Sequence, residues 1–336
     1  MAVKNVKRED QLVGVIGALR TFTNDDYTPN LEKQAFHLNW VIENGLTTGN
    51  ACIMVAAGGS EGYFMSDAEW EDQIRMGAEV ADGRVPIVAG IFELSAREAV
   101  AKAEFAAKVG CDFVQVAAPH YMLPTNAEVI EHFRWINDNV DIGIFAYNTP
   151  WAQPQPGYDF QEPVFEAFVE FENLVGVKWS SFNQAFYLTM ARMFADKVNF
   201  VCNQMNRVLS LPTKLGFKGF INSDGLVAPR FVLHQWDLFK NKKYDELDDL
   251  LLKTEVDPFL RLTQPEDVVW SSMGEGPYVR MGMEALGLKM GPAFPAQQAM
   301  SPDSVRRRRE GYEKSGLLDW VDWKEELWEE HQRGRA

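Results

Sequence analysis

One lysine lies within an apolar run of the chain, where a charged side chain is unusual. Lys178 stands in Gly176-Val-Lys-Trp-Ser-Ser, a segment whose residue types are typical of a buried β-strand. Burial disfavours the ammonium form, so the pKa of such a lysine falls below its usual value of about 10.4. A neutral amine attacks carbonyl carbons, which makes Lys178 a candidate nucleophile. Two structural alternatives remain: a pair with a buried carboxylate, or a side chain that extends to the rim.

A tyrosine ends the apolar run that precedes this strand. Tyr147 is the last residue of the run 142–147, and parallel strands that neighbour each other end at the same edge of a sheet. Its phenol is therefore expected near Lys178, where it could shuttle a proton during imine formation or carbon–carbon cleavage. The structural alternative is a tyrosine that only packs at the strand end.

Eight short apolar runs alternate with segments of helical periodicity, and they are the elements that must position these residues. The runs are Val13–Ala18, Asn50–Ala56, Pro86–Ile91, Phe113–Pro119, Ile142–Tyr147, Val175–Ser180, Asn199–Asn203 and Gly219–Asp224. Each run is nearly all apolar rather than alternating, which is typical of parallel strands that are buried on both faces. Helix starts at Ser66, Ser95 and Thr125, and a helix stop at Gly110, separate several of these runs.

Eight strands, each followed by a helix, predict an α/β fold of the (β/α)8 TIM barrel type with a helical C-terminal extension. A doubly wound sheet is the rival, but the glycine-rich dinucleotide fingerprint after the first strand is missing. We assign residues 1–228 to the barrel and 229–336 to a helical segment that packs on it. Functional groups of such a barrel project from the C-terminal ends of its strands.

Three segments together resemble the dihydrodipicolinate synthase / N-acetylneuraminate lyase superfamily. They are Tyr147-Asn-Thr-Pro150, Gly176-Val-Lys178 and Gly216-Phe-Lys-Gly-Phe-Ile-Asn-Ser223, and the resemblance extends over roughly residues 10–290. It implies class I chemistry, in which Lys178 forms an imine with a 2-oxo acid and Tyr147 relays protons. Such chemistry requires neither a metal nor an organic cofactor.

The loop after the second strand departs from the family pattern. The family's Gly-Thr-Thr-Gly-Glu appears here as Ala57-Gly58-Gly59-Ser60-Glu61, so both hydroxyl positions are glycine and the hydroxyl relay of the synthase is not intact. The backbone N–H groups of Gly58 and Gly59, together with Ser60, remain candidates for holding a substrate carboxylate. The Gly-Gly pair also resembles the loop of 5-dehydro-4-deoxyglucarate dehydratases.

A second departure follows Pro150. The synthase has an arginine two residues after this proline, whereas this chain has Trp151 and Ala152. Loss of the guanidinium removes the partner for a second carboxylate, which indicates that the chain is not a dihydrodipicolinate synthase proper. Trp151 instead suggests an apolar or aromatic wall, as in hydratase-aldolases; alternatively, it packs under the loop.

Three further residues are candidates for substrate contacts. Pro119-His-Tyr121 resembles the family's Pro-Tyr-Tyr turn, and Tyr121 matches the tyrosine that reaches into a neighbouring subunit's site. That role implies a homo-oligomer, in the family habit a homotetramer built as a dimer of dimers. Asn222 and Ser223 end the last strand and are expected to face the mouth of the barrel.

Composition restricts the partners and the compartment. The net charge of −15 opposes non-specific binding to nucleic acid, and no apolar stretch reaches the length of about 18 residues that a membrane span needs. The three cysteines lie far apart without CxxC spacing, so we expect a reduced, cytoplasmic protein without structural zinc. The tail carries Arg306–Arg309 and then Trp320, Trp323 and Trp328, a predicted docking face for the barrel or a neighbouring subunit.

These observations predict a Schiff-base-forming lyase that cleaves or condenses a 2-oxo acid, as a pyruvate-type aldolase or hydratase-aldolase does. One alternative is a dehydratase of a deoxy-oxo sugar acid, which shares the imine but breaks a carbon–oxygen bond. Another is a non-catalytic homologue that binds 2-oxo acids. The lost hydroxyls favour this second alternative, whereas the retained Lys178 and Tyr147 weigh against it.

Overall fold

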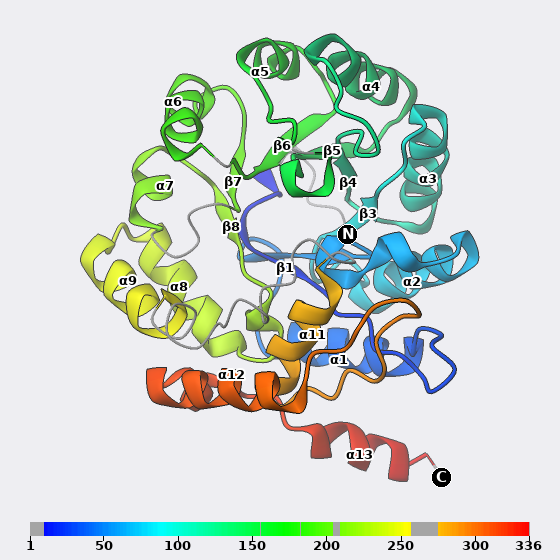
Figure 1. Ribbon diagram of the computed structural model, residues 1–336, viewed down its shortest axis with the longest axis vertical. Helices are drawn as coiled ribbons and strands as arrows, with labels where there is room; N and C mark the ends of the chain where they lie inside the picture. Colours follow the sequence, from blue (N-terminus) through cyan, green and yellow to red (C-terminus); the bar gives the residue numbers. More distant parts are fainter. Residues whose placement is uncertain (1–9, 155, 182, 204–208, 257–274, 336) are drawn as a thin grey trace.

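Eight parallel strands close into one barrel in chain order, as the sequence predicts. The computed structural model describes residues 10–154, 156–181, 183–203, 209–256 and 275–335. The helices that follow the strands form a ring around them, and the C-terminal helices gather on the side of α1 and α8 (Figure 1). The prediction of a TIM barrel with C-terminal helices is confirmed.

Each predicted apolar run coincides with one strand of the barrel, and only β6 begins outside its run, one residue earlier, at Leu174. The strands are β1 (Gly14–Ala18), β2 (Ala51–Val55), β3 (Ile87–Ile91), β4 (Phe113–Ala117), β5 (Gly143–Tyr147), β6 (Leu174–Trp179), β7 (Phe200–Cys202) and β8 (Gly219–Ile221). Several strands end before the apolar run does, because the chain leaves the hydrogen-bonded ladder while it is still buried. These first loop residues lie at the mouth of the barrel.

Helices surround the barrel. They are α1 (Leu31–Glu43), α2 (Asp67–Ala81), α3 (Ala96–Val109), α4 (Asn126–Asn139), α5 (Glu162–Val169), α6 (Gln184–Phe194), α7 (Ser210–Lys214) and α8 (Pro229–Lys240). Three of them, α2, α3 and α4, begin directly after the predicted caps Ser66, Ser95 and Thr125. Ser66 and Thr125 form complete capping boxes, Ser95 caps α3, and Gly110 ends α3 at a φ of 101°. Helix α8 starts at the predicted boundary after residue 228 and contacts β1; the division of the chain there stays a prediction.

Two apolar layers flank the strands. Ile16, Ala18 and Phe145 belong to a cluster that fills the barrel interior, whereas Val15 and Leu19 face the helices. This alternation follows from the two-residue period of a strand. Side chains that continue the inner series beyond the strand ends therefore point into the mouth of the barrel.

After α8, the described part of the C-terminal extension contains the helices α9 (Tyr244–Leu251), α11 (Gly276–Ala285), α12 (Pro302–Ser315) and α13 (Glu325–Arg333). The extension docks on this chain's own barrel through Trp323. Its ring centroid lies 4.8 Å from that of His37 and 5.1 Å from that of Trp40, both on α1. The Trp323 backbone N–H also donates to Val227 O at 3.0 Å.

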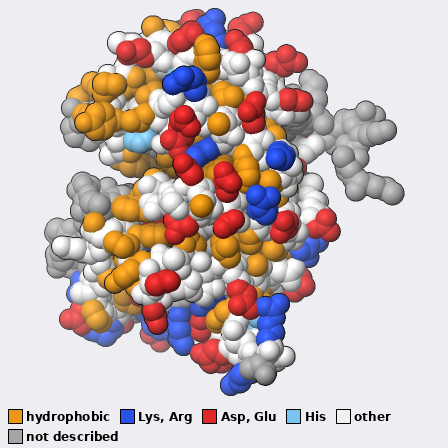
Figure 2. Space-filling model, turned by 90° about the vertical axis from the view of Figure 1, so that its right-hand side faces the viewer, with side chains coloured by type: hydrophobic (Ala, Val, Ile, Leu, Met, Phe, Trp, Pro, Cys, Tyr) orange, Lys and Arg blue, Asp and Glu red, His pale blue; other side chains and the backbone are white. Residues whose placement is uncertain are grey.

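Tryptophan and arginine side chains of the tail make contacts within the chain. Trp320 stacks on His234 and Trp328 packs on Phe36, so all three tail tryptophans contact the barrel helices. In the basic run, Arg306 pairs with Asp303 and Glu310, and Arg309 donates to Ala285 O. Acidic and basic side chains are mixed on the face in Figure 2. No helix in the described part of the chain is both long and apolar enough to cross a membrane.

Replacement of Trp323 by alanine should strongly destabilise the fold. Only 3% of this residue is exposed, and removing a buried aromatic side chain typically costs about 3–5 kcal/mol. Denaturant unfolding of Trp323→Ala measures the loss. Trp135→Ala is the control, because Trp135 is 47% exposed and its loss should cost much less. Equal stability of both variants would contradict the docking described here.

Candidate active site

Lys178 and Tyr147 lie side by side at the C-terminal end of the barrel interior. They are direct partners in the parallel pairing of β5 and β6. The Lys178 Nζ lies 3.9 Å from the centroid of the Tyr147 ring, and only 5% of Lys178 is exposed. In the described part of the chain no carboxylate lies within ion-pair distance of this nitrogen, so the first structural alternative is not realised there.

Burial is the main influence on the Lys178 amine. It lowers the pKa of Lys178 from 10.5 to about 8, while the charge of Glu275 raises that pKa and the charge of Arg20 lowers it. Near pH 8 about half of the amine is therefore neutral and nucleophilic. Burial also raises the pKa of Tyr147, and Glu275 adds to this effect, so the phenol keeps its proton.

Glu275 is a carboxylate at this site that the sequence did not reveal. It immediately precedes α11, and its charge raises the pKa of both the Tyr147 phenol and the Lys178 amine. Its backbone N–H donates to the Tyr63 hydroxyl at 3.0 Å. No motif marks this residue, because it reaches the barrel mouth from a helical segment far along the chain. Only the packing of that segment brings it to Lys178.

Arg20 is a second charged group that sequence reasoning missed. It follows β1 and continues the inner series of Ile16 and Ala18, which is the signal that could have identified it. Its guanidinium is buried, and its Nη1 donates to Gly59 O at 2.8 Å. Its charged surroundings include the carboxylates of Asp224, Glu275 and Glu61, each of which raises the Arg20 pKa against the lowering by burial.

The loop after β2 is shaped by its two glycines. Gly58–Ser60 form a buried turn of 3-10 helix. A Cβ at Gly59 would lie 2.6 Å from Arg20 Nη1, and one at Gly58 would lie 3.7 Å from Glu275 Oε1. The missing side chain of Gly59 therefore leaves room for Arg20, and Glu275 lies in van der Waals contact with the Gly58 position. The Ser60 hydroxyl is buried and has no hydrogen-bond partner among the described residues.

Glu61 fastens this loop to the C-terminal extension. Its carboxylate lies 2.8 Å from Arg280 on α11, and both side chains are buried. Glu61 adopts a left-handed backbone conformation with φ 60°, which ends the 3-10 turn. Because α11 also follows Glu275, this ion pair fixes the loop and the carboxylate relative to each other.

Trp151 and Tyr121 lie in the loops after β5 and β4. Trp151 is in a 3-10 turn (Pro150–Ala152), with its ring centroid 6.1 Å from that of Tyr147 in an edge-on arrangement. Trp151 thus forms a wall beside the tyrosine. Tyr121 is 75% exposed and is followed by exposed Met122 and Leu123, so it lies away from this chain's own Lys178.

Asn222 and Ser223 are engaged in hydrogen bonds within the protein. The Asn222 amide donates to Gln235 on α8 at 3.0 Å, and its oxygen accepts from the Asp224 backbone. The Ser223 hydroxyl accepts from the Ala18 backbone at 2.9 Å. These bonds tie the end of β8 to α8 and β1, and the predicted substrate contacts of both residues stay a prediction.

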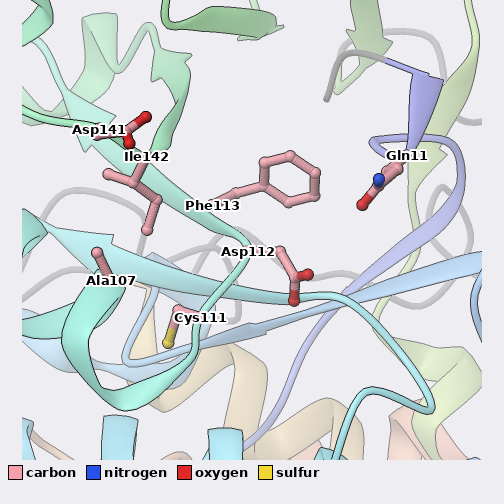
Figure 3. A pocket seen from close by; sticks show the side chains of 7 residues that line it. All are labelled: Gln11, Ala107, Cys111, Asp112, Phe113, Asp141 and Ile142. Atoms are coloured by element: carbon pink, nitrogen blue, oxygen red, sulfur yellow. The ribbon is translucent and has the colours of Figure 1, made fainter. Parts of the chain in front are cut away.

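A pocket also opens at the opposite end of the barrel (Figure 3). It has a volume of about 250 Å³ and is lined by Gln11, Asp112 and Asp141, which precede strands, among others. Barrel enzymes place their chemistry at the C-terminal ends of the strands, so we do not assign this pocket to the reaction. Among the described residues, no three His, Cys, Asp or Glu side chains gather as metal ligands would.

Comparison with known proteins supports the resemblance to the dihydrodipicolinate synthase superfamily. A 4-hydroxy-tetrahydrodipicolinate synthase of Clostridium novyi is 27% identical over 217 residues, 65% of this chain and 71% of that protein. Dihydrodipicolinate synthase from Aquifex aeolicus matches the fold with a TM-score of 0.76 at 23% identity, over 93% of this chain and 100% of that one.

A prophage protein of the dihydrodipicolinic acid synthase family from E. coli K12, solved in complex with pyruvate, also has this fold. Its TM-score is 0.76 at 18% identity, over 91% of this chain and 99% of that one. The model of the dihydrodipicolinate synthetase family matches residues 11–269. These residues include every strand of the barrel, Lys178 and Tyr147, and the chain therefore belongs to this family of lyases.

Proposed function

We propose that the protein is a lysine-imine lyase that cleaves or condenses a 2-oxo acid of the pyruvate type. The observation that carries the proposal is the buried Lys178, whose pKa is lowered to about 8 and whose Nζ lies against the Tyr147 ring. A buried amine that is half neutral near pH 8 is suited to attack a ketone.

The reaction proceeds through covalent steps on Lys178. The neutral Nζ attacks the keto carbon, and the carbinolamine loses water to give a protonated imine. A base takes the proton of the C4 hydroxyl and the bond between C3 and C4 breaks. The electron pair of that bond moves toward the imine nitrogen, so an enamine forms and the other fragment leaves as an aldehyde. Protonation at C3 and hydrolysis then release pyruvate and restore the amine.

Tyr147 and Glu275 form the proton relay in this proposal. The Tyr147 phenol keeps its proton, because burial and the nearby charge of Glu275 both raise its pKa. It can therefore pass a proton to the departing hydroxyl of the carbinolamine or to the aldehyde oxygen while it exchanges protons with Glu275. Glu275 also occupies the space beside Gly58, where the family pattern has a threonine hydroxyl. A carboxylate thus takes the place of the missing hydroxyl.

Two sets of groups beside Lys178 indicate which parts of a substrate the site accepts. The backbone N–H groups of Gly58 and Gly59, with Ser60, border the site on the β2 side and suit a carboxylate. Trp151 borders it on the Tyr147 side and suits an apolar or aromatic aldehyde portion. These features favour a pyruvate-releasing aldolase or hydratase-aldolase over a dihydrodipicolinate synthase proper.

A dehydratase of a deoxy-oxo sugar acid is the second candidate. The observation that favours it is the Gly58-Gly59 pair itself, which resembles the loop of 5-dehydro-4-deoxyglucarate dehydratases and lies beside the charged Arg20 and Glu275. It would use the same imine, but it would expel a hydroxyl group instead of an aldehyde. Release of pyruvate from the substrate distinguishes the two reactions.

We also propose a cytoplasmic homotetramer built as a dimer of dimers. Tyr121, Met122 and Leu123 expose 75%, 70% and 48% of their surface in one loop. A contiguous apolar loop of this kind is typical of a protein–protein interface. In the assembly, Tyr121 would reach the site of a neighbouring copy.

Borohydride reduction in the presence of pyruvate should attach a pyruvate-sized group to Lys178. Peptide mass spectrometry locates the adduct, and Lys178→Ala should show none. Lys218→Ala is the control, because Lys218 lies at the opposite end of the barrel and pairs with Asp10. No adduct on wild-type Lys178 with pyruvate or with larger 2-oxo acids would refute the imine proposal.

Removal of the phenol should slow turnover of a 2-oxo acid substrate by about 10²–10⁴-fold, the usual contribution of a positioned acid or base. Steady-state kinetics of Tyr147→Phe test this, with Tyr158→Phe as a control tyrosine that bonds Asn126 instead. Normal turnover in Tyr147→Phe would rule out the relay.

Adduct formation should increase with pH with a midpoint near pH 8 and level off about one to two pH units above it. The pKa of Lys178 is lowered, so raising the pH through 8 converts the ammonium to the reactive amine. In Glu275→Gln the midpoint should move to lower pH, because Glu275 raises the Lys178 pKa. Trapping rates measured from pH 6 to 10 test both statements; a midpoint near 10 in the wild type would contradict the effect of burial.

A further inference from the structure

Arg20 carries a buried positive charge that no carboxylate of the described chain neutralises by direct contact. Only 6% of the residue is exposed, and its recorded hydrogen bond runs from Nη1 to Gly59 O. Its Nε is buried without a hydrogen-bond partner among the described residues. A buried charge without a partner is costly, so such a group is expected where a ligand completes its surroundings.

The guanidinium reaches the mouth of the barrel from the wall opposite Lys178. In the closed barrel, β1 is separated from β6 by β7 and β8. Arg20 is nevertheless close enough to act on the Lys178 amine, and Glu275 acts electrostatically on both side chains. Arg20 and Lys178 therefore border the same barrel mouth, which a small molecule bonded to Nζ would occupy.

The loop after β2 is built to admit this side chain. Because a Cβ at Gly59 would lie 2.6 Å from Nη1, any larger residue there would displace the guanidinium. Gly59 O holds one nitrogen, which leaves the edge formed by Nε and Nη2 for other partners. That edge matches the two oxygens of a carboxylate in a bidentate pair.

We propose that Arg20 binds the carboxylate of the 2-oxo acid that reacts with Lys178 and thereby selects anionic over uncharged carbonyl compounds. The inference rests on the proposed imine chemistry for the identity of the ligand. The contact itself is non-covalent and precedes the attack of the amine. It gives Arg20 a role in specificity, separate from proton transfer by Tyr147.

Binding of L-lactate tests the carboxylate contact without imine formation, because lactate carries a carboxylate but no ketone. Calorimetric titration should show binding to the wild type and at least a tenfold weaker dissociation constant for Arg20→Gln, with partial recovery in Arg20→Lys. Arg134→Gln is the matched control, since Arg134 is a surface residue of α4. Equal affinities in wild type and Arg20→Gln, or no lactate binding to the wild type, would overturn the proposal.

Trapping with two ketones separates charge recognition from a structural role of Arg20. Pyruvate and methyl pyruvate carry the same keto group, but the ester has no charge. In Arg20→Gln the half-saturating concentration should rise at least tenfold for pyruvate and less than twofold for methyl pyruvate. An equal rise for both would show that Arg20 merely supports the loop. If Arg20→Gln does not fold, Arg20→Lys is measured in its place, with a smaller rise confined to pyruvate.

The two proposals fail in different ways. If lactate binding depends on Arg20 but neither ketone is trapped on wild-type Lys178, the imine function fails and the carboxylate site stands. If pyruvate is trapped but neither lactate affinity nor charge preference depends on Arg20, the imine function stands and the Arg20 inference fails.

Discussion

The loss of hydration of the Lys178 amine is the physical effect on which the rest of the site depends. An ammonium group inside a barrel of apolar strands loses most of its water, and this lowers its pKa to about 8. The barrel supplies that environment by closing eight short strands around a packed interior. Without closure, the strand that carries Lys178 would leave the amine in water, where it would be almost wholly charged at neutral pH.

Two charges of opposite sign adjust this effect. Glu275 favours the ammonium form of Lys178, whereas Arg20 favours the neutral amine. Because Gly59 has no side chain, the Arg20 guanidinium fits beside the loop after β2, and Glu275 lies next to Gly58. The two glycines, which stand where the family pattern has hydroxyl residues, thus border a set of charged side chains.

The C-terminal extension contributes to the site as well as to stability. It carries Glu275, and its α11 holds the loop after β2 through the buried pair of Arg280 and Glu61. Farther along, Trp323 packs against His37 and Trp40 of α1. Trp323 therefore docks on the barrel of its own chain. The same extension also supplies the Glu275 carboxylate to the mouth of the barrel.

The sequence by itself determined the barrel and the central pair of the site. Apolar runs and helix caps are local patterns, and they show where each strand ends. Lys178 and Tyr147 lie at the ends of neighbouring strands, so the sequence was enough to predict that they are close together. The inward orientation of Arg20 was only weakly indicated by the sequence, because Arg20 continues the alternate, inward-facing residues of β1. Glu275 had no such indication, because its position depends on how a distant helix packs, and the hydrogen bonds of Asn222 likewise depend on the contact between β8 and α8. Periodicity encodes which face a residue takes, whereas contacts between segments far apart in the chain arise only when the barrel closes and its extension docks.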